Sequence, residues 1–264
     1  MSGTSGVPLW NAPAGGAPIR HTGCVAIHQQ AIDHLNDDRV ALAAAGELID
    51  QLRRRGITDG LVVDLGCGSG LTAKRLSEAG FDVLGVDISS EMIELAKTNA
   101  PAVEFVVASL FDVDIPPCAA VTAIGESINH AFDPSTSRSD VAGFAQRVFD
   151  VLLPGGLVML DAAGPGRIGL GEQNDARFEG EDWALFVRTE GAPDGRSMTR
   201  ETMLFRRDGE LWRRSDEKHD LVLYSPETVT EQLLTAGFDV VVMSGYEDLT
   251  FPEGWNGFLG RKKR

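Results

Sequence analysis

Short apolar runs alternate with amphipathic segments along the first 164 residues. Runs rich in Val, Leu, Ile and Ala, typical of strands buried on both faces, occupy residues 61–65, 81–87, 103–110, 120–127 and 157–164. Segments with apolar residues at helical spacing occupy residues 28–55, 71–80, 89–100 and 139–153. This succession predicts parallel strands joined by helical crossovers. We therefore predict an α/β fold built on a doubly wound, mostly parallel sheet.

The pattern changes after residue 164. The glycine-rich stretch GPGRIGLGEQND precedes three extended segments separated by the turn signals APDG and DG, which predicts an antiparallel β meander. A helix capped by Ser225 and opened by Pro226 then leads into two last strands, at 238–246 and 255–263, which complete a seven-stranded sheet. The expected organisation is a flexible N-terminal segment (1–27), a main domain (28–164 and 225–264) and an inserted meander (165–224).

The acidic composition of the chain limits the kinds of molecule that we expect it to bind. The formal net charge is −15 and the sequence pI is about 4.7, so we expect neither nucleic acid nor a membrane surface as a partner. The N-terminus lacks the basic start and apolar stretch of a signal peptide. The three cysteines, at 24, 67 and 118, have no metal-ligand or redox spacing. We therefore expect a cytoplasmic protein with reduced thiols and without a bound metal.

The first strand runs into a turn that carries three glycines, in the stretch VVDLGCGSG (62–70). Positions without a side chain let the backbone approach a ligand, and the following helix offers free amide donors. Asp87 ends the second strand, where a carboxylate can accept both hydrogen bonds of a ribose diol. The combination predicts a site for an adenosine-containing cofactor at the carboxyl edge of the sheet.

The spacing of the glycines separates two kinds of cofactor. A dinucleotide fingerprint reads G-x-G-x-x-G, whereas Leu71 stands here in place of the third glycine. The charge of Asp64 would repel a pyrophosphate, while an aspartate near free amides suits a ligand with an ammonium and a carboxylate group. The pattern disfavours an NAD-dependent oxidoreductase, which remains the weaker alternative.

At this point the motifs VVDLGCGSG, VDIS and LLPGGLVML resemble the class I S-adenosylmethionine-dependent methyltransferases over about residues 45–164. The resemblance implies a small-molecule methyltransferase with S-adenosylmethionine as cofactor. Ser109 stands where many members have an aspartate that binds the adenine amino group, which leaves a hydroxyl and backbone atoms for that contact. The cofactor-binding residues implied are Asp64, Leu65, Gly66, Cys67, Gly68, Gly70, Asp87, Ile88, Ser109, Leu110, Gly125 and Glu126.

The stretch GESINHAF (125–132) follows the fourth strand, where the family places residues beside the transferred methyl group. It lacks the motif of base-modifying methyltransferases and resembles the Ser-x-x-His pattern of small-molecule N-methyltransferases. His130 is therefore a candidate general base or substrate-orienting residue. Glu126, the second candidate catalytic residue, either binds a cationic amine of the substrate or caps the following turn.

Two questions stay open at this level. The meander carries Trp183, Phe186, Phe205 and Trp212 and forms either a lid over the acceptor site or the interface of a homodimer. The glycine turn argues for cofactor binding without proving turnover, so a non-catalytic cofactor-binding protein of the same fold is the main alternative function. The identity of the small-molecule acceptor is not encoded in any motif.

Overall fold

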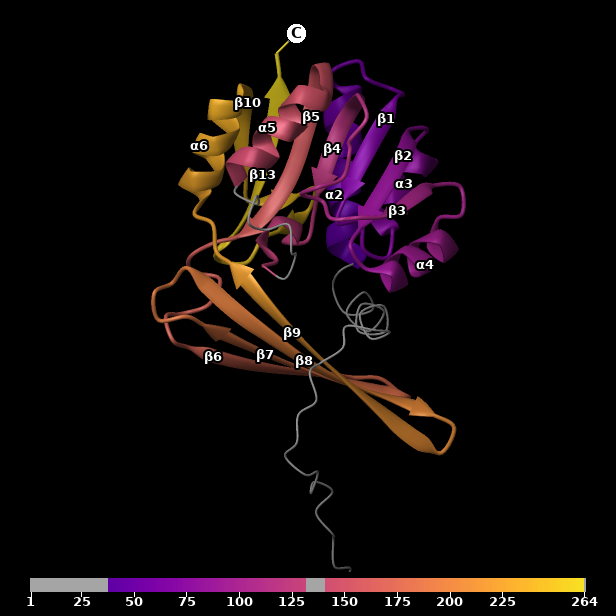
Figure 1. The fold of residues 1–264 in the computed structure, drawn as a ribbon, viewed down its shortest axis with the longest axis vertical. Coiled ribbons are helices and arrows are strands. Elements are labelled where there is room, and N and C mark those ends of the chain that lie inside the picture. Colours follow the sequence, from indigo (N-terminus) through magenta and orange to yellow (C-terminus); the bar gives the residue numbers. More distant parts are fainter. Residues whose placement is uncertain (1–37, 132–140, 264) are drawn as a thin grey trace, which may run out of the picture.

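The computed structural model describes residues 38–131 and 141–263, and it places a seven-stranded sheet above a separate four-stranded one (Figure 1). The order of the seven strands is β10-β13-β5-β4-β1-β2-β3. All neighbours pair in parallel except β13, which is antiparallel to both β10 and β5. The strands are β1 (Leu61–Leu65), β2 (Asp82–Asp87), β3 (Glu104–Val107), β4 (Cys118–Ala123), β5 (Leu152–Ala163), β10 (Phe238–Met243) and β13 (Trp255–Lys262). The predicted doubly wound, mostly parallel sheet is confirmed.

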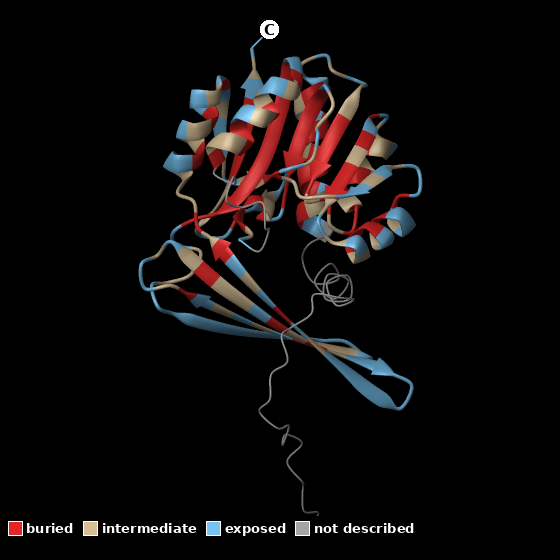
Figure 2. Cartoon of the chain, viewed as in Figure 1, coloured by how far each residue is buried: buried red, intermediate tan, exposed pale blue. Residues whose placement is uncertain are grey.

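Helices cover the two faces of this sheet. They are α2 (Asp38–Arg53), α3 (Leu71–Glu78), α4 (Ser90–Asn99), α5 (Val141–Val151) and α6 (Pro226–Ala236). Residues of α5 and α6 share one apolar core with the sheet, and residues of α2 and α3 share a second core on the opposite face. The central strands β1 and β4, and β5 from Gly156 onward, are almost continuously buried, which explains their apolar sequence (Figure 2).

Local signals set the helix ends. The Ser89 hydroxyl accepts a hydrogen bond from the Met92 amide at the start of α4, and Ser225 caps α6 in the same way. Gly80 follows α3 with a φ of +101°, and Gly237 follows α6 with a φ of +109°. Residues that have a side chain rarely adopt such positive φ values, so glycine is favoured at both helix ends. These helix boundaries agree with the sequence prediction. The expected helix over 28–55 is described from residue 38 onward, and the expected flexible segment 1–27 lies outside the described residues.

Two details of the main sheet differ from expectation. A break in structure was expected at Pro154, Gly155 and Gly156, but β5 runs through them from Leu152. Its register against β4 shifts at this point, so the three residues form an irregularity inside one strand. Two further strands of two residues each, β11 (Gly245–Tyr246) and β12 (Leu249–Thr250), pair with each other. They occur between β10 and β13 along the chain and form a separate small sheet.

The insertion has four antiparallel strands in the order β6-β7-β8-β9, not the three expected. They are β6 (Gln173–Glu179), β7 (Trp183–Gly191), β8 (Ser197–Asp208) and β9 (Leu211–Val222). The missed strand, β6, is polar and almost wholly exposed, so it carries no alternating pattern. Part of the predicted glycine-rich linker is therefore strand.

The insertion lies beyond the carboxyl ends of the parallel strands (Figure 1). Its two faces differ. The inner face, which we define by Trp183, Leu185, Arg200, Thr202 and His219, approaches the main sheet through Arg200 and His219. Of the four aromatic residues considered for a lid, the outer face carries three, Phe186, Phe205 and Trp212. The four aromatic residues therefore do not form one lid.

No helix among the described residues is long and apolar enough to cross a membrane.

We expect Phe258→Ala to lower the free energy of unfolding by about 3–5 kcal/mol, because it leaves a cavity in the core. Phe258 lies in β13 and is fully buried. The control, Leu211→Ala, changes a side chain that is 74% exposed, so its effect stays within about 0.5 kcal/mol. Urea denaturation followed by circular dichroism measures both, and equal losses would contradict the core position of Phe258.

Candidate active site

The glycine turn after β1 is anchored to the neighbouring strand. The amides of Gly66 and Cys67 both donate to the Val86 carbonyl, at 2.7 and 2.9 Å. Gly66, Gly68 and Gly70 have φ values of +72°, +51° and +80°. The turn therefore doubles back over the carboxyl edge of the sheet, in a conformation that glycine adopts without strain.

Space around the three glycines differs. A Cβ atom at Gly66 would lie 2.6 Å from the Ser127 Oγ, and one at Gly70 would lie 2.9 Å from the Ala96 Cβ. A Cβ at Gly68 would meet no atom within 4 Å. Close packing thus requires glycine at 66 and 70, whereas at 68 the bare backbone borders open space.

Asp64 lies inside the sheet at the end of β1 and is 2% exposed. The Thr122 hydroxyl donates to Asp64 Oδ1 at 2.6 Å, and Oδ2 has no hydrogen-bond partner among the described residues. Burial raises the pKa of the Asp64 carboxyl to about 6, partly offset by the Thr122 hydrogen bond. Asp64 does not cap the turn, so it is a buried carboxylate with free capacity to accept.

Asp87 ends β2 beside the same turn. Its Oδ2 accepts from the Gly68 amide and its Oδ1 from the Ser89 amide, each at 2.9 Å. Burial raises the pKa of Asp87, although these amide bonds favour the ionised form. Each oxygen keeps a second lone pair. The next residue, Ile88, is 38% exposed, so its side chain is accessible beside the turn.

Cys67 is a buried free thiol inside the turn, and Cys118 is a second one in β4. Burial raises the pKa of both thiols, that of Cys118 to about 12. Both are therefore protonated and unreactive at neutral pH. The expectation of reduced thiols is confirmed for these two cysteines, while Cys24 lies outside the described residues.

Ser109 and Leu110 follow β3 and serve the local turn. The Ser109 hydroxyl accepts a hydrogen bond from the Phe111 amide at 3.0 Å. The Leu110 carbonyl accepts from the Arg147 guanidinium at 3.3 Å. Both polar groups thus have structural partners, and both residues remain half-buried at the edge of the sheet.

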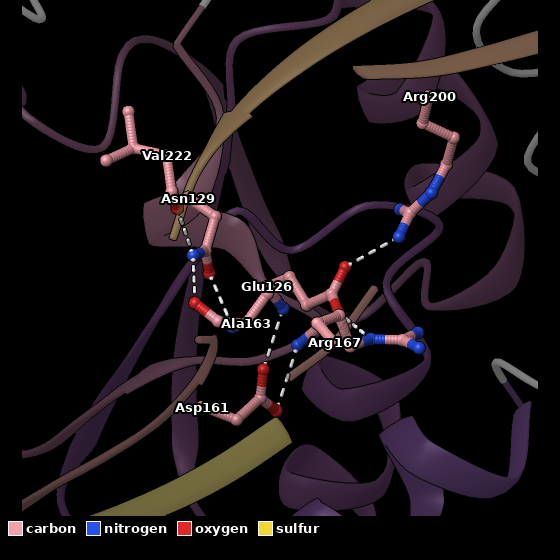
Figure 3. A network of polar contacts seen from close by, with 8 residues as sticks. Glu126, Asn129, Asp161, Ala163, Arg167, Arg200 and Val222 are labelled. Carbon is pink, nitrogen blue, oxygen red and sulfur yellow. Dashed lines mark hydrogen bonds and ion pairs between the residues drawn. The ribbon is translucent and has the colours of Figure 1, made fainter. Parts of the chain in front are cut away.

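The loop after β4 is held by Asp161, a fully buried residue of β5 (Figure 3). Its carboxylate accepts from the amides of Gly125 (3.1 Å) and Glu126 (2.7 Å) and from the Tyr246 hydroxyl (3.0 Å). Gly125 and Glu126 have φ values of +78° and +61°. Burial raises the pKa of Asp161 to about 6, against the effect of the amide bonds. Asp161 therefore fixes a turn that Glu126 disfavours.

The Glu126 side chain is bound by two arginines (Figure 3). Arg167 Nε donates to one carboxylate oxygen at 2.9 Å, and Arg200 Nη2 donates to the other at 3.0 Å. Burial alone would raise the pKa of Glu126, but the two guanidiniums outweigh it and the pKa is lowered. The expected capping of the next turn is wrong, because this carboxylate makes no capping hydrogen bond.

Asn129 ties this loop to the insertion. Its amide group donates to the carbonyls of Ala163 (2.8 Å) and Val222 (2.6 Å) and accepts from the Ala163 amide (3.0 Å) (Figure 3). Ala163 and Val222 are the last residues of β5 and β9. One buried side chain thus joins the loop, the main sheet and the insertion.

His130 ends the loop and pairs through its backbone with Leu221 of β9. Its ring meets the His219 ring edge-on, with centroids 5.4 Å apart. Burial, together with the nearby His219 and Arg200, lowers the pKa of His130 to about 3. Its imidazole is therefore neutral at physiological pH.

Sequence reasoning missed four residues of this arrangement: Asn129, Asp161, Arg167 and Arg200. A signal existed for Asp161, because it is the single charged residue in the apolar run LVMLDAAG. No local signal pointed to the other three, since their partners are distant in the chain. The structure brings the predicted residues of the glycine turn, Asp87 and the Gly125–His130 loop to one edge of the sheet.

Residues 62–156 match the family described as a methyltransferase domain. The putative methyltransferase YqeM of Bacillus subtilis is 27% identical over 190 residues, which span 69% of this chain and 74% of that protein. A methyltransferase structure from Clostridium acetobutylicum superposes with a TM-score of 0.77 at 18% identity, covering 92% of this chain and all of that one. The sugar N-methyltransferase KedS8 from Streptoalloteichus gives 0.73 at 21% identity, over 98% of this chain and all of its own. Residues 62–156 are thus similar to methyltransferase domains, and the chain shares the fold of these solved methyltransferases.

Proposed function

We propose that the protein transfers the methyl group of S-adenosylmethionine to a nitrogen or oxygen atom of a small molecule by in-line displacement. The observation that carries the proposal is Asp64, a buried carboxylate whose Oδ2 has no partner among the described residues. An uncompensated buried acceptor is costly unless a ligand satisfies it. It lies beside a glycine turn whose backbone at Gly68 borders open space.

The donor set fits the cofactor. We infer that Asp64 and the turn of Leu65, Gly66, Cys67, Gly68 and Gly70 bind its methionine end, where Asp64 accepts from the ammonium. Asp87 would accept from the ribose hydroxyls through its second lone pairs, and the exposed Ile88 would cover one face of the adenine. Ser109 and Leu110 would border the adenine edge, and Gly125 and Glu126 would lie beside the sulfur.

The chemistry divides between cofactor and protein. Bound S-adenosylmethionine supplies a methyl group already activated on a sulfonium. The protein has to align the acceptor with that methyl group, and such alignment contributes about 7–11 kcal/mol in well-oriented reactions. The acceptor would lie between the Gly125–His130 loop and the inner face of the insertion, so we propose residues 165–224 as the acceptor-binding subdomain.

Two observations favour a small acceptor. The net charge of −15 opposes binding to a polyanion such as nucleic acid. One structural neighbour, which superposes over 98% of this chain, is named as a sugar N-methyltransferase. The main alternative is a protein that binds the cofactor without turnover. Incubation with methyl-labelled cofactor and a cell extract distinguishes the two functions. The alternative predicts bound cofactor but no labelled small molecule.

We propose an orienting role for His130. A general base works best when its pKa is near the operating pH, and the pKa of His130 is lowered to about 3. The neutral ring can still accept a hydrogen bond from the acceptor. For Glu126, whose charge is paired with two arginines, we propose a positioning role.

A homodimer and a cytoplasmic location stay predictions. The outer face exposes Phe186 and Trp212 by 39% and 48%, which would suit an interface between two copies. Light scattering coupled to gel filtration gives the mass of the particle.

We expect Gly66→Ala to weaken binding of S-adenosylhomocysteine by at least about tenfold, because the methyl would displace Ser127 and the turn. Gly56→Ala is the matched control. Its φ of +76° is similar, but no atom lies within 4 Å and it is remote from the turn, so only stability falls, by about 1 kcal/mol. Calorimetry measures both affinities, and equal binding would contradict the role of the turn.

We expect the affinity for S-adenosylhomocysteine to fall as pH falls through the pKa of Asp64, about 6 in the free protein. The ligand ammonium favours the ionised carboxylate, so binding should be about tenfold weaker at pH 5 than at pH 7. Asp64→Asn has no carboxylate to titrate there and should bind weakly at both pH values. A wild-type affinity independent of pH over this range would contradict the contact.

With the acceptor identified by labelling, His130→Ala should reduce kcat at least about tenfold, and His130→Asn, which keeps a hydrogen-bonding group, should reduce it less. For an orienting residue, the shape of the pH–rate profile between pH 6 and pH 9 stays the same. Loss of one limb of that profile in His130→Asn would instead identify a general base.

A further inference from the structure

Arg167 and Arg200 are more exposed to solvent than Glu126, the residue that both of them bind. The Glu126 side chain is only 5% exposed, whereas those of Arg167 and Arg200 are 28% and 25% exposed (Figure 3). The guanidinium carbon of Arg167 also lies 5.7 Å from the centre of the Trp255 ring, in a cation–π contact. Each arginine is therefore bound to Glu126 and still partly exposed to solvent.

Within this hydrogen-bonded cluster the charges do not balance, because Glu126 supplies one negative charge for two guanidiniums. Two other buried carboxylates nearby contact different groups. The oxygens of Asp161 accept from Gly125, Glu126 and Tyr246, and Glu217 of the inner face contacts His219. A guanidinium has five N–H donors, and among the described residues each of the two makes one hydrogen bond, to Glu126. The two guanidiniums therefore keep N–H donors that make no hydrogen bond within the described residues, and together with Glu126 they carry a net positive charge at a partly buried position.

The cluster lies where an acceptor has to bind. Glu126 precedes Ser127, which packs against Gly66 of the cofactor turn. Arg200 comes from the inner face of the insertion, and Thr202 follows two residues later on the same face. Thr202 is 4% exposed, and its hydroxyl has no hydrogen-bond partner among the described residues. Unused polar groups thus converge from two sides of the proposed acceptor site.

From this geometry we propose that Arg167 and Arg200 bind an oxyanion of the acceptor, so that the substrate carries a carboxylate or phosphate group in addition to the atom that is methylated. The inference rests on the proposed function and narrows its substrate class. Glu126 holds the two guanidiniums side by side before the acceptor arrives. Planar N–H forks in this position suit the two oxygens of such a group.

The test uses calorimetry on the full chain saturated with S-adenosylhomocysteine, at constant ionic strength. The probes are acetate, malonate and inorganic phosphate, with acetamide as the neutral counterpart of acetate. We expect at least one anion to bind and acetamide not to bind. Arg200→Gln and Arg167→Gln should each weaken anion binding about tenfold or more. The preferred probe distinguishes a carboxylate from a phosphate acceptor.

Arg188→Gln is the matched control, because Arg188 is an exposed arginine of the same sheet that pairs with Asp175 on the outer face. Its anion affinity should equal that of the wild type. Unchanged affinity for S-adenosylhomocysteine in an arginine variant shows that the variant folds. If Arg200→Gln fails to fold, Arg167→Gln alone tests the inference. Absence of anion binding despite cofactor binding, or wild-type anion affinity in both variants, overturns the inference. Failure of the wild type to bind cofactor would overturn the proposed function instead.

Discussion

The carboxylate of Asp161 is the constraint on which the rest of the site depends. It is buried in the central sheet and accepts from two successive amides of the Gly125–Glu126 turn. That turn requires positive φ at a non-glycine residue, a conformation that costs about 1 kcal/mol or more without support. With the turn fixed, Ser127 packs against the glycine turn and Glu126 faces the arginines. One hydrogen-bonded side chain thus couples the donor half of the site to the acceptor half.

The two halves are built by different physical means. The donor half uses backbone: glycines, strand ends and amides at the carboxyl edge of a parallel sheet. The acceptor half uses side chains that come from the loop after β4, from the segment after β5 and from β8. Backbone recognition is insensitive to most substitutions, whereas side-chain recognition changes with single residues. On the proposed function, the fold therefore sets which donor binds, and the side chains of this particular sequence set which acceptor binds.

This division explains what could be predicted from the sequence. The strands of the main sheet, the helix cap at Ser225 and the glycine turn follow from local patterns, and they were predicted correctly. Strand β6 was missed because its residues are polar and exposed, so only pairing with β7 makes it a strand. The contacts of Glu126 were missed because its partners lie 41 and 74 residues away in the chain. No pattern within a short window encodes such proximity.

The two points where the insertion joins the main domain lie next to each other. The Tyr224 amide donates to the Ala163 carbonyl at 3.0 Å, so the chain leaves β5 and returns from β9 at nearly the same place. A module with adjacent ends can be lengthened, shortened or exchanged during evolution without disturbing its host. Such a joint allows residues 165–224 to change while the host sheet keeps its structure. If this segment binds the acceptor as proposed, acceptor selectivity can change independently of the main domain.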